Sequence, residues 1–410
     1  MKILLWTQYF WPEHFHINEV ALSLAEAGED LTVLTGKPNY PGGTIFPGYK
    51  ALGVQREVHQ GMDVVRLPLR SRCLGRARDL ALNYLSFIVS GYLLGPLVLR
   101  KKRFDVVFVY APSPLLQALP ALFFAWSHGI PLVLWVQDLW PEALVSTGFV
   151  RNKFLLRVIE RVVRFIYRHA DLLLISSEGF RASVRQRGGS PEKIIYHPNS
   201  SGMAPITTVI HHSVRLLVEE IGQHFSIVYA GNMGTVQSLD TVVATARLLQ
   251  HRPDIRFYLI GGGTQAKSLA EQISRFGLDN IRMHEWIAAD EIHAVYQAAS
   301  VLLVPLKDDL LIRHTVPNKL QVYMAAAKPI IVSGNGEVAR TLVQADAGLD
   351  CAAGDVQALA ETVLRMRSMT PDQLSRFGAN GKAYFQQHFE LRLKTQTLVK
   401  LIRSLLPTEL

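Results

Sequence analysis

The chain has 410 residues, of which 49% are hydrophobic and 19% are charged, and its formal net charge is +9. This length predicts two domains, and this composition excludes an intrinsically disordered chain. The two cysteines, Cys73 and Cys351, offer neither a disulfide framework nor a metal-ligand spacing. The basic excess indicates an anionic partner such as a nucleotide or a lipid surface. Nucleic acid ranks last, because no zinc-finger or RNP signature is present.

Short apolar segments alternate with helix-type patterns along the first half of the chain. The predicted strands are 2–6, 31–34, 64–67, 106–109, 132–136, 172–175 and 194–196, with a helix at 19–27 between the first two. This alternation predicts a parallel sheet with helices on both faces. The sequence His197-Pro198-Asn199 interrupts it, and the irregular stretch 200–222 is interpreted as the linker to a second domain.

The loop after the first strand, residues 8–19, is rich in aromatic and polar side chains. A second loop at 39–43 is expected at the same sheet edge. Because sugars stack on aromatic faces, these loops predict a site for a sugar acceptor. Its candidate residues are Trp11, Pro12, Glu13, His16, Asn39 and Tyr40. His14 and His16 are not expected to bind a metal, since no further ligands converge on them.

Two carboxylates, Asp138 and Glu142, follow the strand predicted at 132–136, in a loop that we expect to face a cleft between the domains. Asp138 is the catalytic candidate, because a carboxylate there can orient or deprotonate an acceptor hydroxyl. Gln137 and Glu142 are candidates for binding the acceptor. A helix N-cap explains Asp138 about equally well.

A nearly apolar stretch covers residues 80–99 and ends in Arg100-Lys101-Lys102-Arg103. A membrane-spanning helix needs about 20 apolar residues, and polar or helix-breaking residues interrupt this one, so we favour a helix that is buried or touches a bilayer. Two more basic clusters comprise Arg70, Arg72, Arg76 and Arg78, and Arg151, Lys153, Arg157, Arg161, Arg164 and Arg168. A solvated surface explains any one cluster, whereas three favour peripheral binding to an anionic membrane. The short apolar start, Ile3–Leu5, does not fit a signal peptide, so we expect the inner, cytoplasmic face.

A second series of strands is predicted at 226–229, 255–260, 281–283, 301–304 and 330–332, so both halves of the chain are expected to be doubly wound. Glycine-containing loops follow the first two of these strands, at Gly231–Gly234 and Gly261–Gly263. Glycine lets a backbone approach a ligand closely, and helix N-termini attract phosphate. An ordinary tight turn explains the first loop about equally well. The second loop fits a dinucleotide-binding pattern without its acidic partner, so a dehydrogenase is a runner-up only.

The segment Val316–Ser333, VPNKLQVYMAAAKPIIVS, combines a turn, a short helix and a buried strand. Lys319 falls in the first turn of that helix, where the helix dipole disfavours a cation. A lysine at this position therefore indicates a bound anion. The preceding loop contains Asp308 and Asp309, and a solvated loop explains this pair better than a metal site does.

These segments resemble family 4 glycosyltransferases, in particular bacterial enzymes that build O-antigen lipopolysaccharide, colanic acid and similar polysaccharides, including fucosamine transferases. The likeness covers nearly the whole chain, through VQDLWPE, HPNSSG, YAGNMG, LIGGG and AASVLLVPL. It implies the GT-B fold, an α/β architecture in which two Rossmann-like doubly wound domains face a cleft. Residues 1–205 would bind the acceptor and residues 206–391 the nucleotide sugar, while 392–410 would form a helix that crosses back to the first domain.

The resemblance implies a hexosyl- or N-acetylhexosaminyl-type transferase that retains anomeric configuration and needs neither metal nor cofactor. The donor would be a UDP-sugar and the acceptor a polyprenyl-diphosphate-linked saccharide. Lys319 and Arg313 are the candidates for stabilising the leaving diphosphate. The donor-binding candidates are Gly231, Asn232, Met233, Gly234, Gly261, Gly262, Trp286, Ile287, Pro317, Asn318, Lys319 and Leu320. For Trp286, a partly buried packing role is at least as good an explanation.

The chain departs from the family pattern at three places. The residues Thr235, Val236 and Gln237 stand where relatives have a basic residue, so this loop is expected to bind through backbone amides alone. A glutamate pair is replaced by His314 and Val322, and a histidine of many relatives falls at Gln137. Two alternatives stay open: a sugar-nucleotide epimerase of the same fold, and a silent subunit that binds UDP without transferring sugar.

Overall fold

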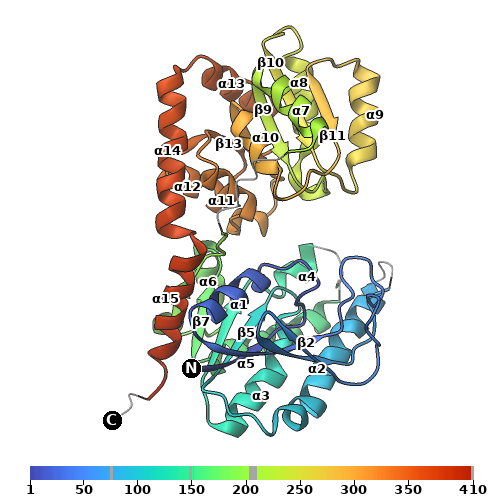
Figure 1. Cartoon of the computed structure of the whole chain (residues 1–410), viewed down its shortest axis with the longest axis vertical. Coiled ribbons are helices and arrows are strands. Elements are labelled where there is room, and N and C mark those ends of the chain that lie inside the picture. Colours follow the sequence, from blue (N-terminus) through green and yellow to red (C-terminus); the bar gives the residue numbers. More distant parts are fainter. Residues whose placement is uncertain (74–76, 147–149, 151, 203–209, 408–410) are drawn as a thin grey trace. The chain divides into compact units, whose positions relative to one another are not determined.

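The computed structural model describes residues 1–73, 77–146, 150, 152–202 and 210–407 (Figure 1). The chain forms two compact units. Unit 1 comprises Met1–Asn199 with Leu391–Leu410, and unit 2 comprises Ser200–Glu390. The first boundary predicted from the sequence, between residues 205 and 206, lies outside the described residues, and the second predicted boundary follows residue 391.

Unit 1 contains a sheet with the strand order β3-β4-β2-β1-β5-β6-β7-β8. Its strands are β1 (Lys2–Trp6), β2 (Asp30–Gly36), β3 (Gln55–His59), β4 (Met62–Leu67), β5 (Val106–Ala111), β6 (Leu132–Val136), β7 (Leu172–Ile175) and β8 (Ile194–Tyr196). All pairs are parallel except β3 with β4, which is antiparallel. The prediction of a purely parallel sheet was therefore wrong at this edge, where a short turn at Gln60 and Gly61 joins two adjacent strands.

Helices cover both faces of the sheet in unit 1. On one face lie α1 (Ile17–Glu26) and the C-terminal helix α15 (Leu391–Arg403), which share one apolar core with the strands. On the other lie α2 (Ala77–Leu99), α3 (Ala118–His128) and α5 (Lys153–His169). The shorter α4 (Glu142–Ser146) and α6 (Arg181–Gln186) follow strands β6 and β7. Arg403 of α15 donates to Glu29 at 2.7 Å, which ties the chain end to unit 1.

Unit 2 contains a wholly parallel sheet with the order β11-β10-β9-β12-β13-β14. Its strands are β9 (Phe225–Ala230), β10 (Ile255–Ile260), β11 (Ile281–His284), β12 (Val301–Pro305), β13 (Ile330–Ser333) and β14 (Gly348–Cys351). Its helices are α7 (His212–Gly222), α8 (Leu239–Leu248), α9 (Ala266–Phe276), α10 (Ile292–Ala298), α11 (Asn318–Ala325), α12 (Glu337–Gln344), α13 (Val356–Arg367) and α14 (Pro371–His388). Two apolar clusters, one on each face, form the core.

Each sheet has a point where the strand order reverses. In unit 1 it lies between β1 and β5, and in unit 2 between β9 and β12. In open parallel sheets, ligands bind beyond the carboxyl ends of the strands at such a point. The segments that leave β1, β9 and β12 carry predicted site residues, so the fold brings these residues to the expected positions within each unit.

Candidate functional site

The glycine loops of unit 2 are joined by backbone hydrogen bonds. Gly231 N donates to Ile260 O at 2.8 Å, and Met233 N donates to Gly262 O at 2.7 Å. Gly261 has φ +128°, and a Cβ there would lie 2.2 Å from Gly231 O. Only glycine permits this close approach, which fixes the two loops as one platform beyond the ends of β9 and β10.

Lys319 lies against this platform. Its Nζ donates to Ala230 O and stands 4.0 Å from the centroid of the Tyr229 ring. A Cβ on Gly231 would lie 2.2 Å from Nζ, so the glycine leaves room for the lysine. Burial lowers the pKa of the Lys319 amine to about 7. Lys319 and Ala230 are 89 residues apart in the sequence, yet the fold places the cation beside the glycine loop at the switch point.

The expectation that the Gly231–Gly234 loop binds through backbone amides alone does not fit its hydrogen bonds. The amides of Gly231 and Met233 are bonded to backbone carbonyls, and Gly234 N donates to Gln237 Oε1 at 3.0 Å. Three of the four amides in the loop therefore have partners inside the protein. The Lys319 ammonium is the better donor for an anion at this loop.

Some of the remaining donor-binding candidates have exposed side chains, and others are partly or fully buried. Trp286 is 63% exposed, and a Cβ on Gly262 would lie 2.9 Å from its Nε1, so the indole lies over that glycine as an open platform. The packing explanation for Trp286 is therefore wrong. Asn232 and Asn318 are exposed, while Gly261 is buried and Gly262, Ile287 and Pro317 are partly buried. The side chains of Met233 and Leu320 lie in the core, so these two can contact a donor only through their backbone.

Arg313 is already paired. Its guanidinium forms two hydrogen bonds of 2.7 Å with the Asp308 carboxylate, and Asn335 donates to the same carboxylate at 3.1 Å. These hydrogen bonds lower the pKa of Asp308 to about 2, so the pair is charged at neutral pH. Arg313 would have to leave this partner to meet a phosphate, which makes it a weaker catalytic candidate than Lys319.

In unit 1, Asp138 lies beyond the carboxyl end of β6. Its carboxylate accepts a hydrogen bond from Ser113 Oγ at 3.1 Å, and Trp140 Nε1 donates to the same hydroxyl at 3.1 Å. Burial raises the pKa of Asp138 to about 6, against the opposing effect of the Ser113 hydrogen bond. The next helix, α4, starts at Glu142, which makes Pro141 its N-cap position. The N-cap explanation for Asp138 is therefore wrong, and its raised pKa suits a general base.

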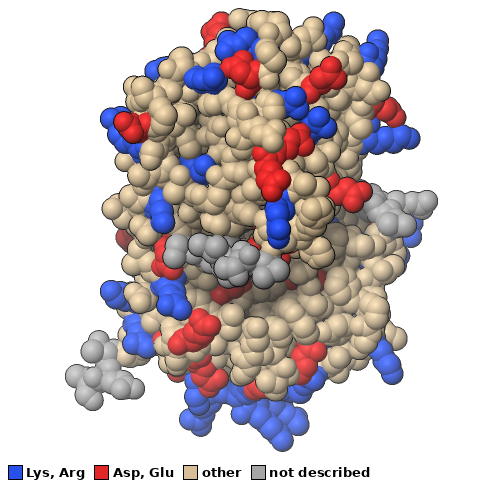
Figure 2. All heavy atoms as spheres, turned by 45° about the horizontal axis from the view of Figure 1, so that its top comes forward, with Lys and Arg blue, Asp and Glu red and all other residues tan. Residues whose placement is uncertain are grey.

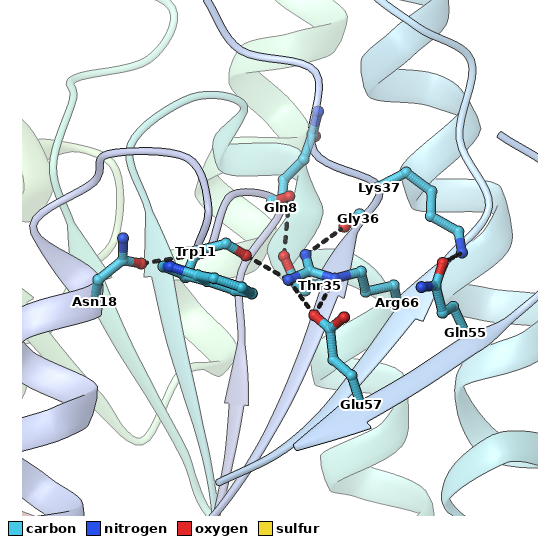
Figure 3. Close-up of polar contacts among 9 residues, drawn as sticks. All are labelled: Gln8, Trp11, Asn18, Thr35, Gly36, Lys37, Gln55, Glu57 and Arg66. Carbon is cyan, nitrogen blue, oxygen red and sulfur yellow. Dashed lines mark hydrogen bonds and ion pairs between the residues drawn. The ribbon is translucent and has the colours of Figure 1, made fainter. Parts of the chain in front are cut away.

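A buried guanidinium holds the aromatic loop after β1 in place (Figure 3). Arg66 of β4 donates to Trp11 O, to Gly36 O at 3.3 Å and to Glu57 Oε1 at 2.6 Å. The indole of Trp11 stacks on His59 with centroids 4.1 Å apart and remains 39% exposed. This loop is thus pinned from below while an aromatic face stays open to a ligand.

Glu13 and Asn39 are structural residues. Glu13 is 1% exposed, and its Oε1 accepts from Asn39 N and Tyr40 N at 2.8 Å each. The Asn39 side chain is buried and donates to Lys37 O at 2.9 Å. These two buried side chains shape the loop that presents Tyr40, so the prediction that they contact an acceptor was wrong.

The other acceptor candidates are only partly accessible. Glu142 forms a 2.7 Å ion pair with Arg187, which ties α4 to α6. His16 lies against the Trp135 ring, with centroids 5.6 Å apart, and burial lowers its pKa to about 4. Pro12 and Gln137 are partly buried. In the described residues, no hydrogen bond reaches the buried Gln137 Nε2, so this amide is free to bind a ligand.

A cation over aromatic rings was not among the predicted site residues. The Arg72 guanidinium lies 5.0 Å from the Tyr40 ring centroid and 5.8 Å from that of Tyr9. Burial raises the pKa of the nearby Tyr84 phenol, and the negative charge of the Asp138 carboxylate also raises it, by less. In the sequence, Arg72 is only one member of a basic cluster, because no local pattern shows that the loop after β4 turns back onto Tyr9 and Tyr40.

The described residues hold no group of three or more His, Cys, Asp or Glu side chains arranged to bind a metal ion.

Two family models match the chain. The model described as glycosyl transferase 4-like domain matches residues 14–200, and the model described as glycosyl transferases group 1 matches residues 224–368. Together they cover most of unit 1 and most of unit 2. The chain belongs to the family 4 glycosyltransferases.

Curated relatives of this glycosyltransferase carry similar names. The probable glycosyltransferase WbjE of Pseudomonas aeruginosa is 24% identical over 335 residues, 80% of this chain and 81% of the relative. The putative colanic acid biosynthesis glycosyl transferase WcaI of Escherichia coli K12 is 25% identical over 324 residues, which are 75% and 77% of the two chains. The chain is therefore an enzyme that transfers sugars.

The fold of this glycosyltransferase is GT-B, as the sequence predicted. The Anabaena protein Alr3699/HepE, solved in complex with UDP, matches with a TM-score of 0.71 and 14% identity, over 98% of this chain and 100% of that one. At this level of identity the match supports the architecture, and the roles of individual residues depend on the geometry described above.

Proposed function

We propose that this glycosyltransferase moves a hexosyl or N-acetylhexosaminyl group from a UDP-sugar to a polyprenyl-diphosphate-linked saccharide in bacterial polysaccharide biosynthesis. Unit 2 holds the donor and unit 1 holds the acceptor. The reaction retains anomeric configuration and needs neither metal nor cofactor. The names of the relatives support a polysaccharide product, and the UDP in the Alr3699/HepE structure supports the nucleotide.

The observation that carries this proposal is the position of Lys319. As the bond between the sugar and UDP breaks, the diphosphate gains negative charge, and a fixed cation stabilises that charge. Lys319 Nζ lies at the end of β9 beside Gly231, where a doubly wound sheet binds its ligand. Mass spectrometry of lipid-linked glycans tests the function in cells. Deleting the gene should leave a glycan that lacks one sugar, and an unchanged glycan profile would contradict the proposal.

In unit 1, Asp138 acts as the base for the acceptor hydroxyl, and the exposed side chains of Trp11 and Tyr40 bind the acceptor sugar. The Arg72 guanidinium, held over Tyr9 and Tyr40, is the cation placed to meet an anionic group of the acceptor. Both sets of groups lie beyond the carboxyl ends of the strands around the switch point of unit 1.

Trp286→Ala should weaken UDP binding by about 5- to 150-fold, because stacking of a base on an aromatic side chain is worth about 1–3 kcal/mol. The indole is exposed and supported by Gly262, so its removal should leave the fold intact. Calorimetric titration with UDP measures the change. Phe276→Ala on α9, another partly exposed aromatic of unit 2, is the control. Unchanged UDP affinity in Trp286→Ala would exclude the stacking role.

Binding of UDP should take up a proton at neutral to mildly alkaline pH. The free Lys319 amine has a pKa lowered to about 7 by burial, and a diphosphate beside it favours the charged form and raises that pKa. UDP affinity should therefore fall as the pH rises above about 7. Titrations in two buffers with different ionisation enthalpies measure the uptake. It should vanish in Lys319→Met, and equal heats in both buffers for the unmodified protein would contradict the prediction.

A further inference from the structure

Helix α2 presents an apolar face to solvent. The outward side of a surface helix is normally polar. The exposed positions of α2 instead recur every three or four residues as large apolar side chains: Leu85, Val89, Tyr92, Leu93 and Leu97. On the opposite side, Gly91 and Gly95 pack closely on the Trp6 ring. In the described residues, α2 is the one helix long and apolar enough to cross a membrane, yet only 28% of its most apolar window is buried. Core packing therefore explains one face only.

The exposed apolar surface continues onto α3 and α5. Tyr92 of α2 contacts Phe123 of α3 with centroids 5.9 Å apart, and Trp126 of α3 contacts Phe165 of α5 at 5.7 Å. Phe123, Trp126 and Phe165 are all exposed. A patch that spans three helices marks an interaction surface. Tryptophan and tyrosine are the side chains favoured where a membrane meets water.

A basic hollow lies at the C-terminal end of α2. Its volume is about 710 Å³, and it is lined by Val54, Arg56, Leu97, Val98, Arg100, Lys101 and Lys102. Arg56 donates to Val98 O and Lys102 pairs with Asp63, so these two cations are engaged. Arg100 and Lys101 are exposed, and in the described part of the chain no ion pair involves either of them. Two uncompensated cations thus adjoin the exposed Leu97 side chain.

More cations surround this surface. Arg157, Arg161 and Arg168 are exposed on α5, and Figure 2 shows Lys and Arg side chains gathered on unit 1 at the bottom of the view. Of the predicted basic residues, Arg76 and Arg151 lie outside the described residues. A second copy of the chain would bring like charges together on such a face, whereas an anionic bilayer offers both phosphate and hydrocarbon.

We propose that the exposed stripe of α2 docks unit 1 on a bilayer containing anionic phospholipid. Leu93 and Leu97 enter the boundary between headgroups and acyl chains, and Arg100 and Lys101 bind a headgroup phosphate in the hollow. The geometry is that of a helix lying in the plane of the interface. This inference rests on the proposed function, because a polyprenyl-linked acceptor requires the enzyme at the membrane, and it adds the residues that make the contact.

Sedimentation of the full chain with vesicles tests the proposal. The vesicles consist of phosphatidylcholine alone or of phosphatidylcholine mixed with phosphatidylglycerol. The charge variant is Arg100→Glu with Lys101→Glu, and the apolar variant is Leu93→Ser with Leu97→Ser. Their matched controls in unit 2 are Lys267→Glu with Lys382→Glu, and Val343→Ser with Leu216→Ser, all at exposed positions. UDP binding by each variant shows that it is folded.

The unmodified protein should bind the anionic vesicles, and high salt should weaken that binding. Each variant should lose about tenfold or more in vesicle affinity, since a cation at an anionic surface is worth about 1 kcal/mol and a buried leucine more. Each control should stay within about threefold. Absence of vesicle binding, or equal losses in controls and variants, would overturn the proposal. So would a monomer–dimer equilibrium that the leucine changes abolish while vesicle binding persists. If the docking proposal failed in one of these ways while UDP binding and sugar transfer stayed intact, the proposed function would still hold.

Discussion

Lys319→Ala should fold normally and lose about 100- to 1,000-fold in turnover, the typical loss when one preorganised electrostatic group is removed from an active site. Its ammonium is the cation that the structure of unit 2 places on the glycine loop, and the loop amides are largely bonded elsewhere. Because the diphosphate gains charge in the transition state, turnover should fall more than UDP affinity. Steady-state kinetics and calorimetry on the same preparation measure both quantities.

The matched control is Lys328→Ala. Lys328 is also partly buried, and its Nζ also donates to a backbone carbonyl, Gln297 O at 2.8 Å, but this contact is not with the glycine loops. This variant should stay within about threefold of the unmodified turnover. Arg313→Ala should be milder than Lys319→Ala, because Arg313 is paired with Asp308. A Lys319→Ala enzyme within about threefold of full turnover would leave Lys319 only the structural role of bonding Ala230 O, since removal of a catalytic cation should cost far more.

Asp138→Asn should lower transfer by about 100-fold or more while leaving UDP affinity nearly unchanged, because a positioned general base contributes roughly 10²–10⁴-fold. The amide keeps the shape of the side chain and a hydrogen bond with Ser113 but cannot take a proton. Asp171→Asn is the control: Asp171 accepts a hydrogen bond from Leu132 N at 2.8 Å, at the opposite end of the same strand β6. Equal losses in transfer and in UDP binding would place Asp138 in folding or donor binding instead.

The pH profile provides a second test of Asp138. Its pKa is raised to about 6 by burial, and a base works only when it is deprotonated. The value of kcat/KM for the acceptor should therefore fall as the pH drops through about 6, and this decline should be absent from the residual activity of Asp138→Asn. A decline that persists unchanged in the variant would show that another group titrates.

The sequence predicted most of what local pattern controls. The predicted bounds of β6, β7, β8 and β10 match the structure, because buried parallel strands are short apolar runs bounded by polar residues. The meeting of Lys319 with the Gly231 loop was also predictable, since both segments follow strands that flank the switch point. Strand β3, with polar Gln55, Arg56, Glu57 and His59, has no apolar run to reveal it.

What the sequence could not predict depends on contacts between distant residues. Nothing near Glu13 indicates that its carboxylate is buried and that its Oε1 accepts from the amides of Asn39 and Tyr40. Likewise, the pairing of Arg313 with Asp308 depends on the path of an exposed loop, and the placement of Arg72 over Tyr9 and Tyr40 depends on three separate loops. The sequence shows that residues 80–99 are apolar. The side of that helix that faces solvent is known only from the packing of Gly91 on Trp6.

The proposed reaction joins a UDP-linked sugar to a lipid-linked saccharide. The most direct measurement incubates the purified protein with UDP-hexoses or UDP-N-acetylhexosamines and with lipid-linked saccharides extracted from cells that lack the gene. Chromatography that separates sugar epimers, coupled to mass spectrometry, then follows both substrates. The saccharide should gain the mass of one sugar as UDP is released, and Lys319→Ala and Asp138→Asn should nearly abolish this gain. Conversion of the donor without any acceptor would show an epimerase, and binding of UDP with no gain of mass would show a silent subunit; either result would contradict the proposed transfer.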